Sequence, residues 1–144
     1  MSGDHALIST AELASRLGQP TLRLFDCTTY LEPAPAGSSE PYDAVTGRHT
    51  FEAGHIPGAD FLDLQGEFSD SNLKLHFMMP EVAQLEAAFG RHGISANSCV
   101  VLYSIGTAMW LLPFIVYLGG WQAFVHVFND AANLPSSLIQ NLAV

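Results

Sequence analysis

The sequence predicts an α/β domain with a central parallel sheet of about five strands and helices on both faces. Short apolar runs alternate along the chain with segments of helical periodicity. The run Cys99–Tyr103 is continuously apolar and rich in β-branched residues, which is typical of a central parallel strand. With 144 residues, of which 49% are hydrophobic and 13% charged, the chain suits one domain over 1–144 with a sizeable core.

The first helix and strand are signalled near the amino terminus. Residues 9–12, Ser-Thr-Ala-Glu, have the spacing of a capping box, and Leu13 and Leu17 follow on one helical face. Gly18 ends that helix. Residues 22–26 then form a short buried strand that ends in an acid.

The middle of the chain begins with a segment rich in Pro, Gly and Ser. We expect a long surface loop over about 30–46, which could pack on a neighbour. A short helix is predicted over residues 48–53, with Gly54 as its left-handed exit. Residues 60–64 can form another brief strand.

The second half contains the remaining elements. Pro80 suits the first turn of a helix that ends around residues 90–93. After the strand at 99–103, a turn leads into a helix over 108–118. A last strand covers 123–128, and an atypical tail follows over about 129–144. Ligands of open parallel sheets bind beyond the carboxyl ends of the strands, so residues 104–107 are the favoured site.

Composition excludes several functions. The formal charge of -9 argues against binding nucleic acid or an anionic membrane surface. The apolar stretch 108–118 is too short to span a bilayer. The histidines lack metal-ligand spacing, so we expect neither a metal site nor a cofactor. Cys27 and Cys99 lie in apolar runs and are expected to be reduced core residues of a cytoplasmic protein.

One segment carries a recognisable motif, which comprises Phe51 and, after three further residues, His55-Ile56-Pro57-Gly58-Ala59. Pro57 restricts the backbone of Ile56 to an extended conformation, and Gly58 permits a sharp turn into the next strand. We expect His55 to be a structural histidine whose ring bonds backbone groups. A role in proton transfer is the alternative.

This motif resembles the signature of the rhodanese family, and the order of predicted elements agrees with that family over roughly residues 7–120. In active rhodanese domains, the loop after the strand equivalent to 99–103 starts with a cysteine. That cysteine takes up a sulfane sulfur as a persulfide and passes it to cyanide or a thiol. The cysteine suits this chemistry because a thiolate facing backbone amides is a strong, soft nucleophile.

The resemblance places Ser104 where the family has its cysteine. A hydroxyl cannot hold a persulfide, so the resemblance implies that this chain has no catalytic nucleophile at that position. The corresponding cradle comprises Ser104, Ile105, Gly106, Thr107, Ala108 and Met109, and its backbone amides could still bind a small anion. Cys27 follows the strand that ends at Asp26, and Cys99 is about 15 Å from Ser104 along its own strand. Neither remaining cysteine is therefore a convincing sulfur carrier.

The chain is also similar to the N-terminal, non-catalytic half of two-domain thiosulfate and 3-mercaptopyruvate sulfurtransferases. Three features carry this similarity: the loop at 30–46, the Phe61-Leu62-Asp63-Leu64 run with its extended tail, and Met109-Trp110 at the start of the last long helix. It implies a partner, which is a second rhodanese domain or another protein. Arg48 is either a contact to that partner or a solvated side chain.

Two functions follow from these expectations. The favoured one is a catalytically silent rhodanese domain that binds or scaffolds, either alone or as part of a tandem enzyme. The alternative is an active sulfurtransferase that needs another domain or uses a different cysteine. A hydrolase or phosphatase use of the fold is disfavoured because the loop after the strand at 99–103 has neither cysteine nor arginine.

Overall fold

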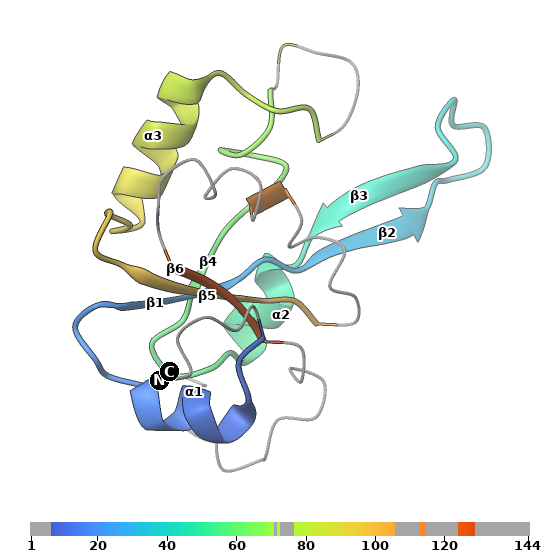
Figure 1. Cartoon of the computed structure of the whole chain (residues 1–144). Helices are drawn as coiled ribbons and strands as arrows, with labels where there is room; N and C mark the ends of the chain where they lie inside the picture. Colours follow the sequence, from blue (N-terminus) through green and yellow to red (C-terminus); the bar gives the residue numbers. More distant parts are fainter. Residues whose placement is uncertain (1–6, 71, 73–76, 106–112, 115–123, 129–144) are drawn as a thin grey trace.

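The computed structural model describes residues 7–70, 72, 77–105, 113–114 and 124–128 (Figure 1). The helices are α1 (Thr10–Arg16), α2 (Arg48–Ala53) and α3 (Val82–Arg91). The strands are β1 (Leu22–Asp26), β2 (Thr29–Pro33), β3 (Tyr42–Thr46), β4 (Asp60–Phe61), β5 (Cys99–Tyr103) and β6 (Phe124–Phe128).

Within these residues, four strands form a parallel sheet in the order β4-β1-β5-β6. β1 pairs with β5 over its whole length, from Leu22 opposite Cys99 to Asp26 opposite Tyr103. The predicted α/β class, the parallel sheet and the last strand are therefore confirmed. The described part of the chain shows four of the roughly five strands expected.

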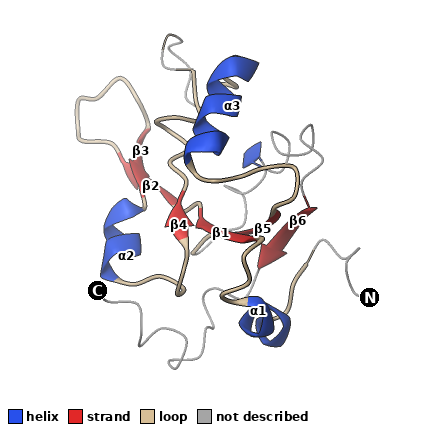
Figure 2. Cartoon of the chain, turned by 90° about the vertical axis from the view of Figure 1, so that its left-hand side faces the viewer, coloured by secondary structure: helices blue, strands red, loops and turns tan. Residues whose placement is uncertain are grey.

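Helices cover both faces of this sheet, as Figure 2 shows. Successive side chains of a strand point to opposite faces, so β1 and β5 feed two separate cores. One core contains side chains of α1 and the other contains side chains of α3. The first includes Leu13, Leu24, Ile56, Val101 and Tyr103, and the second includes Phe25, Leu85, Phe89, Val100 and Leu102.

The ends of α1 follow the predicted signals. The side chain of Ser9 caps the helix by accepting the N–H of Glu12 at 3.2 Å. The helix ends at Arg16, and Gly18 has a φ of 87°, a conformation that glycine adopts without steric cost.

Two details of the other helix boundaries differ from the prediction. Gly54 closes α2 with a φ of 176°, which is extended backbone, so the expected left-handed exit is wrong. Helix α3 begins at Val82, with Pro80 just outside rather than in the first turn. At the other end of α3, Gly93 has a φ of 77° and turns the chain toward β5.

Strand β4 is shorter than the predicted 60–64 segment. Its ladder comprises only Asp60 and Phe61, although Leu62 and Leu64 are also buried. The carboxylate of Asp63 accepts the N–H of Gln65 at 3.0 Å. Phe61 is opposite Asp26, the last residue of β1, so the ladder ends where its partner strand ends.

The expected surface loop at 30–46 is a β-hairpin, which corrects the sequence analysis. Strands β2 and β3 pair antiparallel from Thr29 opposite Thr46 to Pro33 opposite Tyr42. The hairpin extends away from the main sheet (Figure 1). Proline is tolerated here because β2 and β3 form a sheet of only two strands, so each strand has an outer edge.

Two predicted segments lie outside the described residues. They are most of the helix at 108–118 and the tail at 129–144. Within the described ranges, no helix has the length and hydrophobicity needed to cross a bilayer.

Candidate active site at the ends of β1 and β5

The favoured site lies where β1 and β5 end side by side. Asp26 and Tyr103 are paired across the ladder, so Cys27 and Ser104 are the first residues beyond it. The N–H of Cys27 donates to the carbonyl of Tyr103 at 2.8 Å, which extends the pairing by one bond. Ser104 therefore lies at the carboxyl edge of the sheet. Of the predicted cradle, Ser104 and Ile105 are described, whereas residues 106–109 lie outside the described part.

A buried network fixes the start of this loop. Oδ1 of Asp26 accepts the N–H of Thr28 at 2.9 Å and the hydroxyl of Thr28 at 2.5 Å. Thr28 Oγ1 in turn accepts the N–H of Ile105 at 3.0 Å. Asp26 and Thr28 are both 0% exposed. Neither side chain is among the site residues predicted from the sequence. The Asp-x-Thr spacing after a strand is the signal that indicates such a turn.

This network limits what the cradle can do. A backbone N–H has one hydrogen to donate, and that of Ile105 is bound to Thr28. The first amide after Ser104 is therefore not available to an anion. Binding of an anion at this loop would have to rely on other amides.

Among the described residues, two oxygen atoms at the site are buried and have no hydrogen-bond partner. They are Ser104 Oγ and Asp26 Oδ2, for which the described residues provide no hydrogen bond. Burial raises the pKa of the Asp26 carboxyl, although hydrogen bonds from Thr28 and the nearby charge of His55 oppose that shift. A buried polar atom without a protein partner is a usual position for an ordered water or a ligand.

The two cysteines occupy different environments. Cys27 is 0% exposed, and burial raises the pKa of its thiol well above the ordinary value. Cys99 is half-buried at the opposite end of β5, with its Sγ 3.6 Å from Nη1 of Arg16. Cys27 lies at the carboxyl edge near Ser104 but is fully buried, and Cys99 lies at the opposite end of β5. Neither is therefore an exposed thiol beside Ser104.

The motif residues pack behind the site. The ring of His55 stacks on Phe51 with centroids 3.9 Å apart, and its Nδ1 lies 2.7 Å from the carbonyl oxygen of Phe51. Since a carbonyl only accepts, Nδ1 carries a hydrogen. The N–H of Ile56 donates to the buried hydroxyl of Tyr103 at 3.3 Å, which ties the motif to β5.

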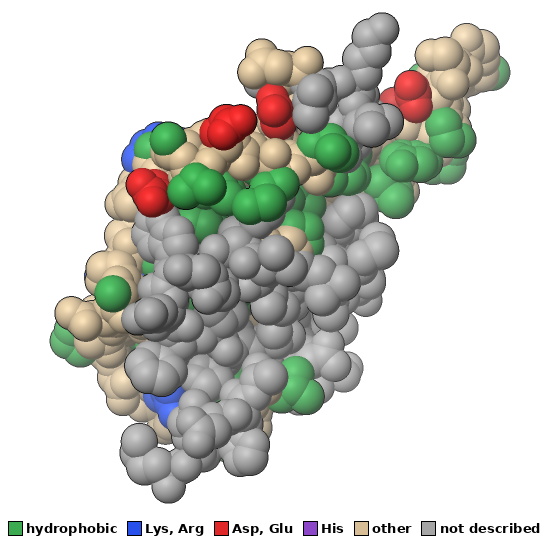
Figure 3. Space-filling view, turned by 45° about the horizontal axis from the view of Figure 1, so that its top comes forward, with side chains coloured by type: hydrophobic (Ala, Val, Ile, Leu, Met, Phe, Trp, Pro, Cys, Tyr) green, Lys and Arg blue, Asp and Glu red, His purple; other side chains and the backbone are tan. Residues whose placement is uncertain are grey.

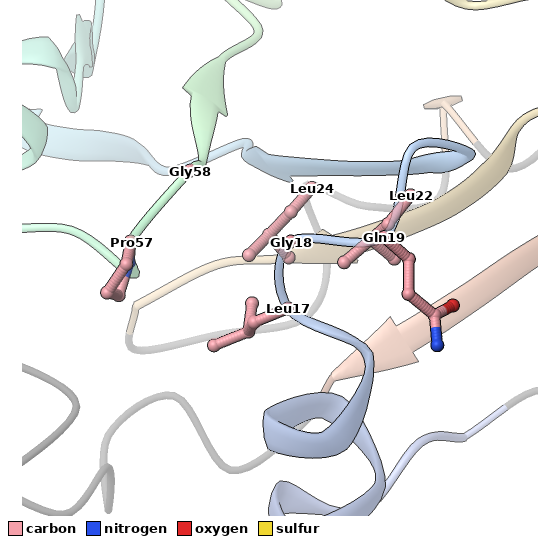
Figure 4. Close-up of a pocket in the computed structure, with 7 residues that line it drawn as sticks. All are labelled: Leu17, Gly18, Gln19, Leu22, Leu24, Pro57 and Gly58. Carbon is pink, nitrogen blue, oxygen red and sulfur yellow. The ribbon is translucent and has the colours of Figure 1, made fainter.

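The turn after Ile56 leads the chain into β4. The N–H of Ala59 donates to the carbonyl of Ile56 at 2.9 Å, and Gly58 has a φ of 81°. Pro57 and Gly58 also line a pocket of about 140 Å³ on the α1 face of the sheet (Figure 4). Leu17, Leu22 and Leu24 complete its apolar wall. Ser104 is not among the residues that line this pocket.

The described residues contain no group of three His, Cys, Asp or Glu side chains arranged to hold a metal ion. The described site therefore contains the buried carboxyl of Asp26, the hydroxyls of Thr28 and Ser104, and the N–H of Ile105. The groups of Asp26, Thr28 and Ile105 are hydrogen-bonded to one another, and the Ser104 hydroxyl has no partner among the described residues.

Comparisons with known proteins agree with this fold. No protein-family model matches the sequence. A probable 3-mercaptopyruvate sulfurtransferase of Pseudomonas aeruginosa is 31% identical over 148 residues, which cover 92% of this chain and 49% of that protein. A human 3-mercaptopyruvate sulfurtransferase is 34% identical over 67% of this chain and 29% of its own length. The chain therefore spans half or less of the length of these relatives.

Solved structures show the same architecture. A sulfur transferase subunit of yeast mitochondrial complex I superposes with a TM-score of 0.70 at 26% identity, covering 86% of this chain and 38% of that one. The 3-mercaptopyruvate sulfurtransferase of Escherichia coli, described as having the rhodanese fold, has a TM-score of 0.68 at 18% identity, over 88% of this chain and 45% of its own. The chain is therefore a rhodanese-like domain, related in sequence to part of the 3-mercaptopyruvate and thiosulfate sulfurtransferases.

Proposed function

We propose that this rhodanese-like domain is catalytically silent on its own and acts by binding a partner. The observation that carries the proposal is the residue that follows β5, which is Ser104. By resemblance, an active member of the family has a cysteine there. The similarity to sulfurtransferases supports a common ancestry and fold. The serine in place of the cysteine supports the absence of activity.

The chemistry explains why a serine does not substitute. A thiolate attacks the outer sulfur of thiosulfate, an S–S bond forms, and the bond to the departing sulfite breaks. Cyanide then takes the outer sulfur as thiocyanate and regenerates the thiolate. A serine hydroxyl stays protonated near neutral pH and cannot form the S–S bond of a persulfide.

The β2–β3 hairpin is the surface proposed to meet a partner. Leu31 pairs with Ala44 and Pro33 with Tyr42, so these four side chains share one face. Leu31 is 44% exposed and Tyr42 39% exposed. Figure 3 shows hydrophobic side chains on this projecting arm beside an acidic one. An exposed apolar face on a projecting element is typical of a protein-binding surface.

The charge of the hairpin indicates the chemistry of that partner. Residues 29–46 contain Glu32, Glu40 and Asp43 but no lysine or arginine. Arg48, which follows the hairpin in sequence, places its guanidinium group 4.8 Å from the centroid of the Phe61 ring. We infer a partner with an apolar patch bordered by basic side chains. A second rhodanese domain in a longer protein, or a separate protein, would both meet this description.

We further propose that the domain corresponds to the N-terminal half of a two-domain sulfurtransferase and that it resides in the cytoplasm. Binding of a small anion at the Ser104 loop is also part of the proposal. The two free cysteines support a reducing compartment such as the cytoplasm. An alternative function, sulfur transfer through a different cysteine, is favoured by one contact, that of Cys99 with Arg16. Cys99 is also the more exposed of the two thiols, so a sulfur donor could reach it more easily than the buried Cys27.

A thiosulfate and cyanide assay separates the two functions. We expect no thiocyanate from the wild-type chain or from Ser104→Ala. Ser104→Cys tests whether the loop can still use a thiol. Turnover by the wild-type chain that disappears in Cys99→Ser but persists in Cys27→Ser would establish the alternative and contradict the silent domain.

A further inference from the structure

Thr28 joins three segments at the candidate site. Its hydroxyl bonds Asp26 at the end of β1 and the N–H of Ile105 at the start of the Ser104 loop. Its carbonyl accepts the N–H of Gly47, the residue between β3 and α2, at 2.9 Å. A Cβ atom added to Gly47 would lie 2.6 Å from that carbonyl oxygen and 2.7 Å from Cβ of Thr28. The residue is therefore enclosed by partners from separate parts of the chain.

Asp26 sets the direction of the Thr28 hydroxyl. A threonine hydroxyl has one hydrogen and two lone pairs. Oδ1 of Asp26 already accepts the backbone N–H of Thr28, so a proton on the carboxyl belongs on Oδ2 and Oδ1 accepts from the hydroxyl in either ionisation state. The single hydrogen of the hydroxyl is thus directed at Asp26, and a lone pair remains for the N–H of Ile105.

We propose that Thr28 is a positioning residue of the Ser104 site. Its oriented hydroxyl holds the amide of Ile105 and fixes the direction in which the loop leaves β5. This proposal rests on the proposed function in taking the Ser104 loop as the site, but it does not depend on whether that site is silent. Its consequence is that the first amide of the loop is closed to ligands.

Amide hydrogen exchange on the ¹⁵N-labelled full chain tests the proposal directly. In the wild-type protein, we expect the Ile105 amide to exchange at least about tenfold more slowly than exposed amides. Thr28→Val keeps the shape of the side chain but removes the hydroxyl, and should speed Ile105 exchange by about tenfold or more. Thr28→Ser retains the hydroxyl and should keep the protection. The amide of Val101 in β5 reports that the fold is intact.

A second readout uses a thiol as a probe of the loop. In the Ser104→Cys background, the rate of alkylation by iodoacetamide is measured against pH. Release of the Ile105 amide provides a donor for the thiolate, so addition of Thr28→Val should shift the profile to lower pH and raise the rate at neutral pH about threefold or more. Addition of Thr28→Ser should leave the profile where it was.

Several outcomes would overturn the proposal. They are fast exchange of Ile105 in the wild-type chain, unchanged protection in a folded Thr28→Val, and Thr28→Ser behaving as Thr28→Val. If Thr28→Val does not fold, Thr28→Ala replaces it. This variant also lacks the hydroxyl, so Ile105 should lose its protection, and unchanged protection in a folded Thr28→Ala would contradict the role of the hydroxyl. Thiocyanate production by the wild-type chain would refute the silent domain without affecting these measurements.

Discussion

The ring of His92 lies between two carboxylates, with Nδ1 2.7 Å from Oδ2 of Asp60 and Nε2 3.0 Å from Oε2 of Glu67. His92 follows α3, Asp60 opens β4, and Glu67 lies in the connection between them. The contacts therefore join the end of a helix to a strand and a loop that are distant in sequence. Arg91 adds a weaker contact to Glu67 at 3.7 Å.

Replacement of His92 should loosen this junction. His92→Ala removes both carboxylate contacts and the ring contacts to Phe25 and Phe68, so we expect it to lower the free energy of unfolding by about 1–3 kcal/mol. Asp60→Asn removes only one contact of a side chain that is 57% exposed, and should cost less than about 1 kcal/mol. Urea unfolding measures both. Equal effects of the two variants would contradict a central role for the ring.

The buried carboxyl of Asp26 should make stability depend on pH. Burial raises its pKa in the folded chain above the ordinary value of 3.8, so the folded state binds the proton more tightly than the unfolded state. Its contribution to stability is fully present below pH 3.8 and is lost as pH rises through the raised pKa. In Asp26→Asn that loss disappears, so the stability of the variant relative to the wild type should increase with pH over this window.

Urea unfolding from pH 3 to pH 8 tests this dependence. Asp63→Asn is the matched control, because Asp63 is a half-buried acid whose carboxylate also accepts a backbone N–H. A constant difference in stability between Asp26→Asn and the wild type across the range would contradict the prediction.

Of the glycines in the described part of the chain, Gly47 is the one where an added side chain meets the closest contacts. Gly47→Ala places a methyl group 2.6 Å from the carbonyl oxygen of Thr28, which forces the backbone to shift and should cost about 1–3 kcal/mol. Gly90→Ala is the control, since no atom lies within 4 Å of its added Cβ and it is inside α3. That variant should be stabilised by up to about 1 kcal/mol. Thermal unfolding measures both changes, and a stable Gly47→Ala would refute the close contact.

The acidic pair on the hairpin should weaken it in isolation. Glu32 and Asp43 are directly opposite each other in the ladder, where like charges are destabilising. Glu32→Gln should raise the free energy of unfolding by a few tenths of a kcal/mol, roughly 0.2–0.5 at low salt, and by less at high salt. Glu40→Gln, a change in the turn of the hairpin, should have little effect. A larger gain at high salt than at low salt would rule out charge repulsion as the cause.

The local patterns predicted much of the fold. Ser9 is a helix cap and Cys99–Tyr103 a central strand because each signal is contained within a few neighbouring residues. The segment 30–46 was predicted to be a loop because it is rich in Pro and Gly. Its hairpin was missed because the pairing depends on contacts between the two strands, which local composition does not indicate. Strand β4 is shorter than predicted because its partner β1 ends at Asp26, opposite Phe61, and this depends on pairing rather than on the apolar run at 60–64.

The site was predictable in position but not in its internal bonding. The end of β5 follows from strand order, which places Ser104 at the carboxyl edge. The Thr28–Ile105 bond joins residues 77 positions apart, and the His92 contacts span 32 and 25 positions. Such contacts arise only after the chain has folded, so no local pattern indicates them.

The hairpin also offers a practical handle on the molecule. Its ladder is anchored at one end by the bond from Gly47 to Thr28 and ends with the pair Pro33 and Tyr42. The residues between that pair form an exposed turn. Because inserted residues at such turns add little closure entropy and disturb no buried contact, a peptide tag or a fluorescent label should be accepted between Gly37 and Glu40. A label there would report on molecules that approach the arm while leaving the two cores intact.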